Sequence, residues 1–403
     1  MNATPPNRVW TDEDINKLLA AAAIITVAFL AIMLVQTTWH FPFPRTHGGS
    51  VIGNDFFNFW TYGQSAFSRD PGAYYHWPTY NLYQKTIGVD EVGHNWSYPP
   101  SIMLLTAPFG YLSYVTSLVV FTLVSIVVFI LVARGDLQDW KLVALALVSP
   151  AAMHCLNSGQ SSLLTAAVIL AAWRLLDKRP IVAGLLIGCL SLKPQVALMF
   201  PFMLLATQRW RVIASAAVTC FAIAALTSVL FGFKVWEQYI YQGIPAQNLV
   251  LTDPTLDSAA MMPTILMTFR RFGLSYDLSM AVQLVFSAAA VVALLWAFRR
   301  PHDVNDRRMF AMFAACTVCA SPYLLIYDLV PLTVAAIFLM KEERSAGVPK
   351  LLLLLIYWLP FLQLAMGDHL RMAGPAFLVP VLIAYLVAGL RDRPWRAAAP
   401  VTA

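Results

Sequence analysis

Long apolar stretches, separated by short polar connections, recur along almost the whole chain. The candidate membrane spans are 18–37, 113–133, 140–154, 161–176, 181–192, 194–207, 211–231, 277–298, 309–322, 328–340, 351–366 and 373–390. An α-helix needs about 20 apolar residues to cross a bilayer, and several of these stretches approach that length. The pattern therefore predicts an all-α integral membrane protein, 1–403, with a single domain of roughly 10 to 12 transmembrane helices.

Some of these stretches are too short to cross a bilayer alone, and polar residues and prolines interrupt them. One break is Leu192-Lys193-Pro194-Gln195, and another is Ser321-Pro322-Tyr323. Backbone that is not helical is tolerated at membrane depth only where protein buries it or where it lines a cavity. We therefore expect both breaks to line a cavity.

Two longer connections interrupt the pattern, at 38–112 and 232–276. Within the first, Phe56, Phe59 and Trp60 recur at helical spacing on one face, while Asp55 and Asn58 lie on the other. This spacing is typical of an amphipathic helix that lies in the membrane interface. We expect interfacial helices in both connections.

Composition supports the membrane class. Hydrophobic residues make up 59% of the chain and charged residues 12%, and the mean hydropathy is +0.66. Soluble domains have roughly 45–50% apolar and 25% charged residues. A net charge of +6 raises the alternative of a nucleic-acid partner.

The placement of the basic residues decides between these readings. They cluster in short connections, around 134–141, 174–179, 209–211, 299–308, 341–350 and 391–396. Such clusters mark the cytoplasmic side, so the charge reflects topology and we expect no nucleic-acid partner. Both termini are then cytoplasmic and the two long connections lie outside the inner membrane.

Mixed charges precede the first apolar stretch, and no small-residue cleavage site follows it before Trp39, so we expect a membrane helix there rather than a signal peptide.

Asp55 is the first candidate for chemistry. It follows Gly53-Asn54 at the predicted start of the interfacial helix. It is either a helix N-cap or a carboxylate held at the mouth of a cavity, where it would act as a general base.

Lys193 and Asp328 are ionisable residues within generally apolar sequence. A charge at such depth is costly unless it is paired or binds a ligand. Lys193 is therefore either the ion-pair partner of Asp328 or a ligand for a phosphate, for which a compact ammonium is suited. Asp328 is otherwise a group that orients a sugar hydroxyl, or a polar helix end.

Other candidates lie in the outer connections. Asn157 and Gln160 belong to a short turn before a helix, which is either a plain turn or a site for hydroxyls or an anion. Arg270 and Arg271 are either interface anchors or a phosphate clamp. His94 and His369 show no ligand spacing, and the C-x-x-C of Cys316 and Cys319 lies in an apolar, small-residue stretch that is typical of helix packing, so we expect no metal and no cofactor.

An ordered set of motifs resembles glycosyltransferase family 87, the polyprenol-phosphate-mannose-dependent mannosyltransferase-like group. The motifs are Asn54-Asp55-Phe56-Phe57-Asn58-Phe59-Trp60, Tyr98-Pro99-Pro100, Ser158-Gly159-Gln160-Ser161-Ser162-Leu163-Leu164, Ala183-Gly184, Leu192-Lys193-Pro194-Gln195, Gln208-Arg209-Trp210-Arg211, Met262-Pro263, Ser321-Pro322-Tyr323 and Tyr327-Asp328. Their order and spacing agree with the family over about 50–340. Some mannosyltransferase members carry histidines after the Ser-Pro, where this chain has Tyr323 to Asp328, so we expect the sugar to be mannose or another hexose or pentose.

The resemblance implies a GT-C fold with a periplasm-facing cavity. A sugar would pass from a polyprenyl-phosphate carrier to a glycolipid or glycan acceptor, among membrane lipids. The acidic residue of the family's first outer loop, its base, falls on Asp55. Charge and depth suggest Lys193, Arg270 and Arg271 for the donor phosphate. We expect substrate contacts from Asn157, Gln160, Gln195, Tyr98, Tyr323 and Asp328.

Two other functions fit part of the pattern. A transporter or lipid flippase would also have broken helices and a buried lysine, but it would show internal repeats that this sequence lacks. An O-antigen polymerase or ligase would share the lipid carrier and the outer cavity, and only an assay separates it from a transferase.

Overall fold

The chain is almost entirely helical in the computed structural model, which describes residues 10–89, 96–299, 306–341, 348–366 and 374–391. Among the described residues, strands are confined to one small hairpin, in which β1 (Thr37–Thr38) pairs antiparallel with β2 (Arg45–Thr46). Its register places Thr37 opposite Thr46. The predicted all-α class is confirmed, and this hairpin is a minor addition to it.

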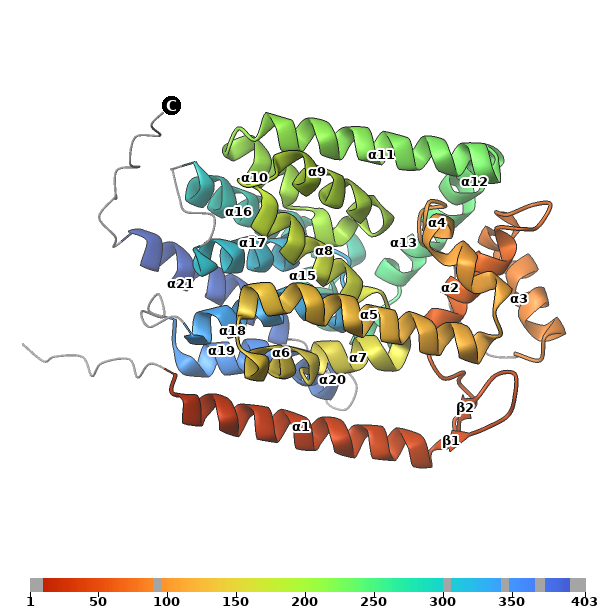
Figure 1. Cartoon of the computed structure of the whole chain (residues 1–403), viewed down its shortest axis with the longest axis horizontal. Helices are drawn as coiled ribbons and strands as arrows, with labels where there is room; N and C mark the ends of the chain where they lie inside the picture. Colours follow the sequence, from red (N-terminus) through yellow and green to blue (C-terminus); the bar gives the residue numbers. More distant parts are fainter. Residues whose placement is uncertain (1–9, 90–95, 300–305, 342–347, 367–373, 392–403) are drawn as a thin grey trace, which may run out of the picture.

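Among the described residues, four helices are long and apolar enough to cross a membrane. They are α1 (Asp12–Val35), α5 (Tyr114–Leu137), α11 (Trp210–Phe231) and α16 (Tyr276–Phe298). Helices α1, α5 and α11 run along the long axis of the molecule (Figure 1). Many of their apolar side chains are uncovered, and Val229 on α11 remains 80% exposed. Lipid tails solvate such a surface and water does not, so these helices indicate a membrane protein.

Shorter helices pack between the long ones. They are α6 (Trp140–Leu147), α7 (Pro150–Ser158), α8 (Ser162–Leu175), α9 (Pro180–Cys189), α10 (Phe200–Ala206), α17 (Arg307–Ala320), α18 (Val330–Lys341), α19 (Lys350–Tyr357), α20 (Leu359–Leu364) and α21 (Leu378–Arg391). Helices α17 and α18 are buried along almost their whole length and form the centre of the bundle. Because many of the predicted spans are short or broken, the number of 10 to 12 crossings stays a prediction.

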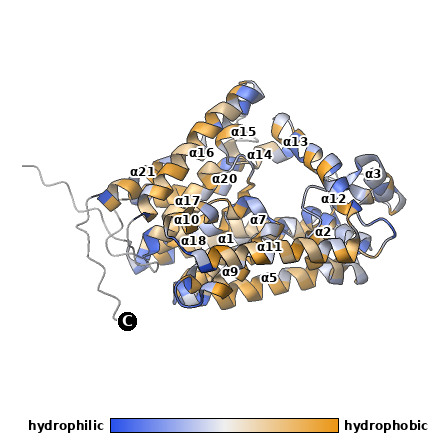
Figure 2. Ribbon diagram, turned by 90° about the horizontal axis from the view of Figure 1, so that it is seen from above, coloured by the Kyte–Doolittle hydropathy of each residue, from blue (hydrophilic) through white to orange (hydrophobic). Residues whose placement is uncertain are grey.

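Polar residues gather at the two ends of the molecule. The helices between the ends are mainly hydrophobic, and hydrophilic segments lie at either end (Figure 2). Helix α2 and its neighbours form one end, and the last turn of α21 lies at the other (Figure 1). This distribution matches a bilayer around the middle of the bundle, with water at both ends.

Ion pairs connect the segments that the charge pattern assigned to the cytoplasm. At the start of α1, Asp12 pairs with Lys341 at 2.9 Å, and Asp14 pairs with Lys350 at 2.8 Å. The first turn of α1, the end of α18 and the start of α19 therefore share one end of the molecule. That arrangement agrees with the predicted alternation of sides, while the identity of the side stays a prediction.

The connection 38–112 carries helices at the opposite end. After the hairpin come α2 (Asn54–Ser65), η1 (Ala73–Tyr75), α3 (Trp77–Thr86), α4 (Ile102–Thr106) and η2 (Ala107–Tyr111). Helix α2 packs closely on the end of α4 and on η2, since a Cβ atom at Gly63 would lie 2.4 Å from the carbonyl oxygen of Thr106 and 2.8 Å from the backbone nitrogen of Gly110. Only glycine permits so close an approach between two backbones.

Helix α2 differs from the predicted amphipathic helix. Its apolar residues are buried, but so are Asn58 and Tyr62 on the polar face. The hydroxyl of Tyr80 donates to Asn58 Oδ1 at 2.6 Å, and the ring of Tyr62 stacks on Trp96 at 3.7 Å between centroids. The predicted helix is confirmed. The prediction that its polar face is uncovered is wrong, because α3 and the segment around Trp96 cover that face.

The connection 232–276 contains α12 (Lys234–Gln238), the π-helical turn η5 (Tyr239–Gly243), α13 (Ile244–Thr252), α14 (Asp257–Ala260) and α15 (Ile265–Arg271). It docks on the first connection through Asp70, which pairs with Lys234 at 2.8 Å and accepts from Gln238 Nε2 at 3.0 Å. The start of the second connection thus packs on the first at this end, and residues from both connections reach the cavity described below.

Candidate active site

Asp55 lies in the first turn of α2. The N-cap of this helix is Gly53, which has a φ of +68°, so of the two alternatives for Asp55 the helix cap is excluded. The carboxylate instead accepts a hydrogen bond from Gln160 Nε2, at 3.0 Å from Asp55 Oδ2. Its position near the helix N-terminus favours a negative charge.

Gln160 connects Asp55 to the interior of the bundle. Its Nε2 also donates to the Tyr327 hydroxyl at 3.1 Å, and its Oε1 accepts from the Tyr98 hydroxyl at 3.0 Å. The same Oε1 lies 3.4 Å from Lys193 Nζ. One side-chain amide therefore links the candidate base, two tyrosines and the buried lysine.

Lys193 and Asp328 form a buried ion pair. Nζ lies 2.5 Å from Asp328 Oδ1, and the two side chains are 2% and 1% exposed. Ser162 Oγ donates to the same carboxylate at 2.8 Å, and the backbone N–H of Leu325 donates to Asp328 Oδ2 at 3.4 Å. Of the two alternatives for Lys193, the structure therefore contains the ion pair with Asp328. The other carboxylate oxygen, Oδ2, is hydrogen-bonded too, as a buried pair requires.

The predicted helix breaks supply these two charges. Lys193 separates the 3₁₀ turns η3 (Leu190–Leu192) and η4 (Pro194–Ala197), while Asp328 lies in η6 (Ile326–Leu329) before α18. The irregular backbone at each break turns its charged side chain inward instead of along a helix face. The rings of Tyr327 and Tyr98 lie 5.1 Å and 6.0 Å from Lys193 Nζ, within the range of cation–π attraction.

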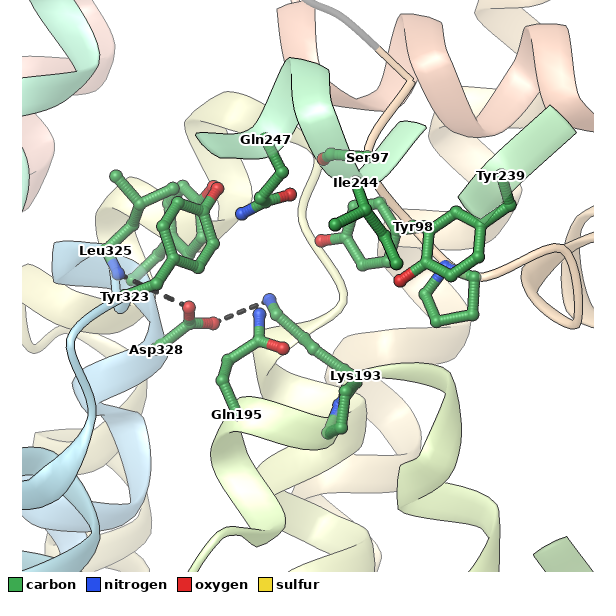
Figure 3. Close-up of a pocket in the computed structure, with 13 residues that line it drawn as sticks. Ser97, Tyr98, Lys193, Gln195, Tyr239, Ile244, Gln247, Tyr323, Leu325 and Asp328 are labelled. Carbon is green, nitrogen blue, oxygen red and sulfur yellow. Dashed lines mark hydrogen bonds and ion pairs between the residues drawn. The ribbon is translucent and has the colours of Figure 1, made fainter. Parts of the chain in front are cut away.

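A cavity of about 320 Å³ opens beside this ion pair. Its lining residues are Ser97, Tyr98, Pro99, Lys193, Pro194, Gln195, Tyr239, Ile244, Gln247, Tyr323, Leu325, Tyr327 and Asp328. The amides of Gln195 and Gln247 approach it from opposite sides (Figure 3). The expectation that both helix breaks line a cavity is confirmed.

The cavity combines aromatic rings with hydrogen-bonding groups. Enclosure raises the pKa of Tyr98 to about 12, although the nearby Lys193 ammonium partly opposes the shift. The phenol is therefore protonated near neutral pH, and its proton is the one donated to Gln160 Oε1. Aromatic faces and amide groups together suit a neutral polyhydroxylated ligand.

Five predicted site residues lie outside the lining of this cavity: Asp55 and Gln160, which are hydrogen-bonded to each other beside it, and Asn157, Arg270 and Arg271. Asn157 is exposed near the end of α7. Arg270 and Arg271 lie in the last turn of α15, and the guanidinium of Arg270 donates to the carbonyl oxygens of Leu274 and Thr252. Arg270 therefore fastens the end of α13 to α15, and a phosphate role for either arginine stays a prediction.

Sequence reasoning did not assign roles to several residues at the site. Ser162 and Tyr327 belong to the motifs quoted above. Their positions in the sequence near Gln160 and Asp328 could have indicated a role at the site. Tyr239 and Gln247 come from the η5–α13 segment. No motif marks them, because only the docking of that segment over the cavity brings them to it.

The described residues contain no group of three or more His, Cys, Asp or Glu side chains that could hold a metal ion. The expectation that no metal is used is left untested by this observation.

By its fold and site, the protein belongs to the general class of helical membrane proteins that have a polar, aromatic cavity at one end of the bundle. A family model described as glycosyltransferase family 87 matches residues 96–322. The match covers more than half of the chain, so the protein belongs to glycosyltransferase family 87 and is a glycosyltransferase. It includes Tyr98, Gln160 and Lys193, whereas Asp55 and Asp328 lie outside it. No curated protein and no solved structure matched the chain.

Proposed function

We propose that this glycosyltransferase moves a sugar from a polyprenyl-phosphate carrier to a glycolipid or glycan acceptor on the periplasmic face of the inner membrane. The observation that carries the proposal is the Asp55–Gln160–Lys193 arrangement beside a cavity at the end opposite the basic connections. A carboxylate and an ammonium lie at the two ends of one amide. A base for the acceptor and a cation for a departing phosphate are the groups that this reaction needs.

In the proposed reaction, Asp55 takes the proton of an acceptor hydroxyl as its oxygen attacks the anomeric carbon. The bond between that carbon and the phosphate oxygen breaks, and its electron pair leaves with the lipid phosphate. Attack from the face opposite the phosphate inverts the anomeric configuration. The groups that stabilise the developing charge are already fixed before the reaction, which reduces the cost of reorganisation.

We assign the donor phosphate to Lys193 rather than to Arg270 or Arg271. Lys193 lines the cavity, whereas the guanidinium of Arg270 is engaged with two backbone carbonyls. A phosphate would compete with Asp328 for the ammonium. Tyr98, Gln195, Tyr323 and Asp328 would contact the sugar, which we propose is a neutral hexose or pentose.

Family membership also bears on the rival functions. A transporter or flippase would move its lipid unchanged, whereas the family's activity is sugar transfer. A polymerase or ligase remains a matter for the acceptor assay, since it would share the carrier.

A donor assay tests the proposal. The purified protein in lipid nanodiscs should transfer labelled sugar from a polyprenyl-phosphate hexose or pentose to glycolipids extracted from membranes of a deletion strain. Nucleotide-activated forms of the same sugars serve as controls and should give no product. Transfer from a nucleotide sugar, with none from any lipid-linked donor, would contradict the proposed donor class.

A topology prediction tests the proposed side of the membrane. Reporter fusions should place both termini and 299–308 in the cytoplasm, and 38–100 outside it. The basic clusters are the physical reason, because they are retained on the cytoplasmic side during insertion. A reporter at 299–308 that is active outside would refute the topology and the periplasmic site with it.

A further inference from the structure

We propose that Gln160 is a positioning residue, which fixes the carboxylate of Asp55 for catalysis rather than binding a substrate. The inference rests on the proposed function, in which Asp55 is the base. It goes against the sequence-based expectation that Gln160 contacts a substrate. Three observations carry it: the hydrogen bonds of its amide, its place outside the cavity lining, and the way its backbone is held.

The amide of Gln160 has its hydrogen-bonding capacity occupied. A glutamine side chain offers two N–H donors and one oxygen with two lone pairs. The donors reach Asp55 Oδ2 and the Tyr327 hydroxyl at 3.0 and 3.1 Å. The oxygen accepts from the Tyr98 hydroxyl at 3.0 Å, with Lys193 Nζ and the N–H of Ser161 slightly farther away. A substrate hydroxyl would have to displace one of these partners.

These contacts also fix which end of the amide faces Asp55. Lys193 Nζ is a donor only, so the amide oxygen must face Lys193 and the amide nitrogen must face the carboxylate. The side chain is buried and does not line the cavity. The charged neighbours therefore determine the orientation of the amide. The role left to it is to hold the carboxylate of Asp55.

The backbone of Gln160 is held against α2, next to Asp55. Gly159 has a φ of +65° and ends α7, and the N–H of Gln160 donates to the carbonyl of Cys155 at 2.8 Å. A Cβ atom at Gly159 would lie 2.5 Å from Cβ of Phe56, the residue after Asp55. The turn is thus in direct contact with the first turn of α2, which sets the distance between the amide and the carboxylate.

If Gln160 holds the catalytic base in place, removing its side chain must slow the reaction. Misplacing a reacting group by about 1 Å costs up to roughly 100-fold in rate. An amide that acts only through Asp55 should affect turnover and leave substrate affinity unchanged, whereas a substrate ligand should change KM.

The test is a double-mutant cycle between Gln160 and Asp55, measured with the full-length protein in nanodiscs and a saturable lipid-linked donor. Gln160→Glu has nearly the same shape and still accepts from Tyr98 and Lys193, but in its ionised form it cannot donate to Asp55 and instead repels that carboxylate. Gln160→Leu removes all of the polar contacts. We expect both variants to lower kcat by roughly 10- to 100-fold, with KM for donor and acceptor within about twofold of wild type.

In the Asp55→Asn background, either Gln160 substitution should cause little further loss, because residues that act as a unit are not additive. Gln283→Leu is the matched control. Gln283 is also buried, and its amide holds Leu266 N–H and the carbonyl of Cys319, away from the cavity. Its loss should lower thermal stability but leave kcat per folded molecule unchanged.

Three outcomes would be decisive. A raised KM with unchanged kcat would overturn the positioning role and restore the substrate-ligand interpretation. Losses that multiply in the double variant would overturn it as well. Full activity of Asp55→Asn alone would instead overturn the base assignment in the proposed function, so the two failures are distinguishable. Should Gln160→Leu not fold, the near-isosteric Gln160→Glu variant carries the test.

Discussion

Replacing Asp55 with asparagine should reduce sugar transfer by roughly 10² to 10⁴, the contribution of a general base, and leave the protein inserted and folded. Asparagine has nearly the shape of aspartate, and its side-chain oxygen still accepts the hydrogen bond from Gln160 Nε2. The fold therefore loses little. The acceptor hydroxyl loses the carboxylate that would take its proton.

The measurement is transfer from a polyprenyl-phosphate donor by the purified variant, with thermal unfolding as the control for integrity. Because Gly53 and not Asp55 caps α2, a loss of activity cannot be attributed to a lost helix cap. Near-normal turnover in a folded variant would remove Asp55 from the mechanism and make Asp328 the next candidate.

Replacing Lys193 with methionine should cost about 3–5 kcal/mol in free energy of unfolding and abolish use of the donor. The side chain of Asp328 is 1% exposed, so the substitution leaves a buried carboxylate without its counter-ion. Combining it with Asp328→Asn should restore most of the stability, because the neutral amide still accepts from Ser162. The double variant should stay inactive, since the cation proposed for the phosphate is gone.

Denaturant unfolding in detergent measures the stability, and donor titration measures the activity. Lys234→Met is the matched control, because Lys234 also pairs with an aspartate at 2.8 Å but its side chain is 67% exposed. An exposed pair contributes about 0–1 kcal/mol, so this control should be nearly neutral. An equally small effect at Lys193, with donor affinity unchanged, would make the buried pair dispensable and move the phosphate site elsewhere.

Local sequence patterns were sufficient to predict much of the bundle and part of the site. The hydropathy pattern located the long helices, and proline at the two breaks indicated where the backbone turns into the cavity. Lys193 and Asp328 were recognisable as candidates because an ionisable side chain within apolar sequence is costly unless it is paired or binds a ligand. Their mutual pairing was one of two alternatives, and only the tertiary packing that brings η6 next to Lys193 decides it.

Other features depend on contacts between distant segments. The polar face of α2 gave no indication that Tyr80 and Trp96 would cover it, since helical periodicity records only which residues share a face. Arg270 looked like a phosphate ligand by charge, yet the carbonyls that hold it belong to its own turn and to the end of α13. Gln247 carries no motif and reaches the cavity through the docking of α13.

The buried ion pair also constrains how the protein is made. Lys193 is synthesised long before Asp328, and helices enter the membrane broadly in the order of translation. Until η6 arrives, the ammonium has no counter-ion and the cavity lacks the wall that carries Tyr323, Tyr327 and Asp328. A chain that stops before Asp328 lacks the carboxylate that pairs with this ammonium in the folded protein. The segment around η6 thus completes the ion pair and the wall of the cavity together.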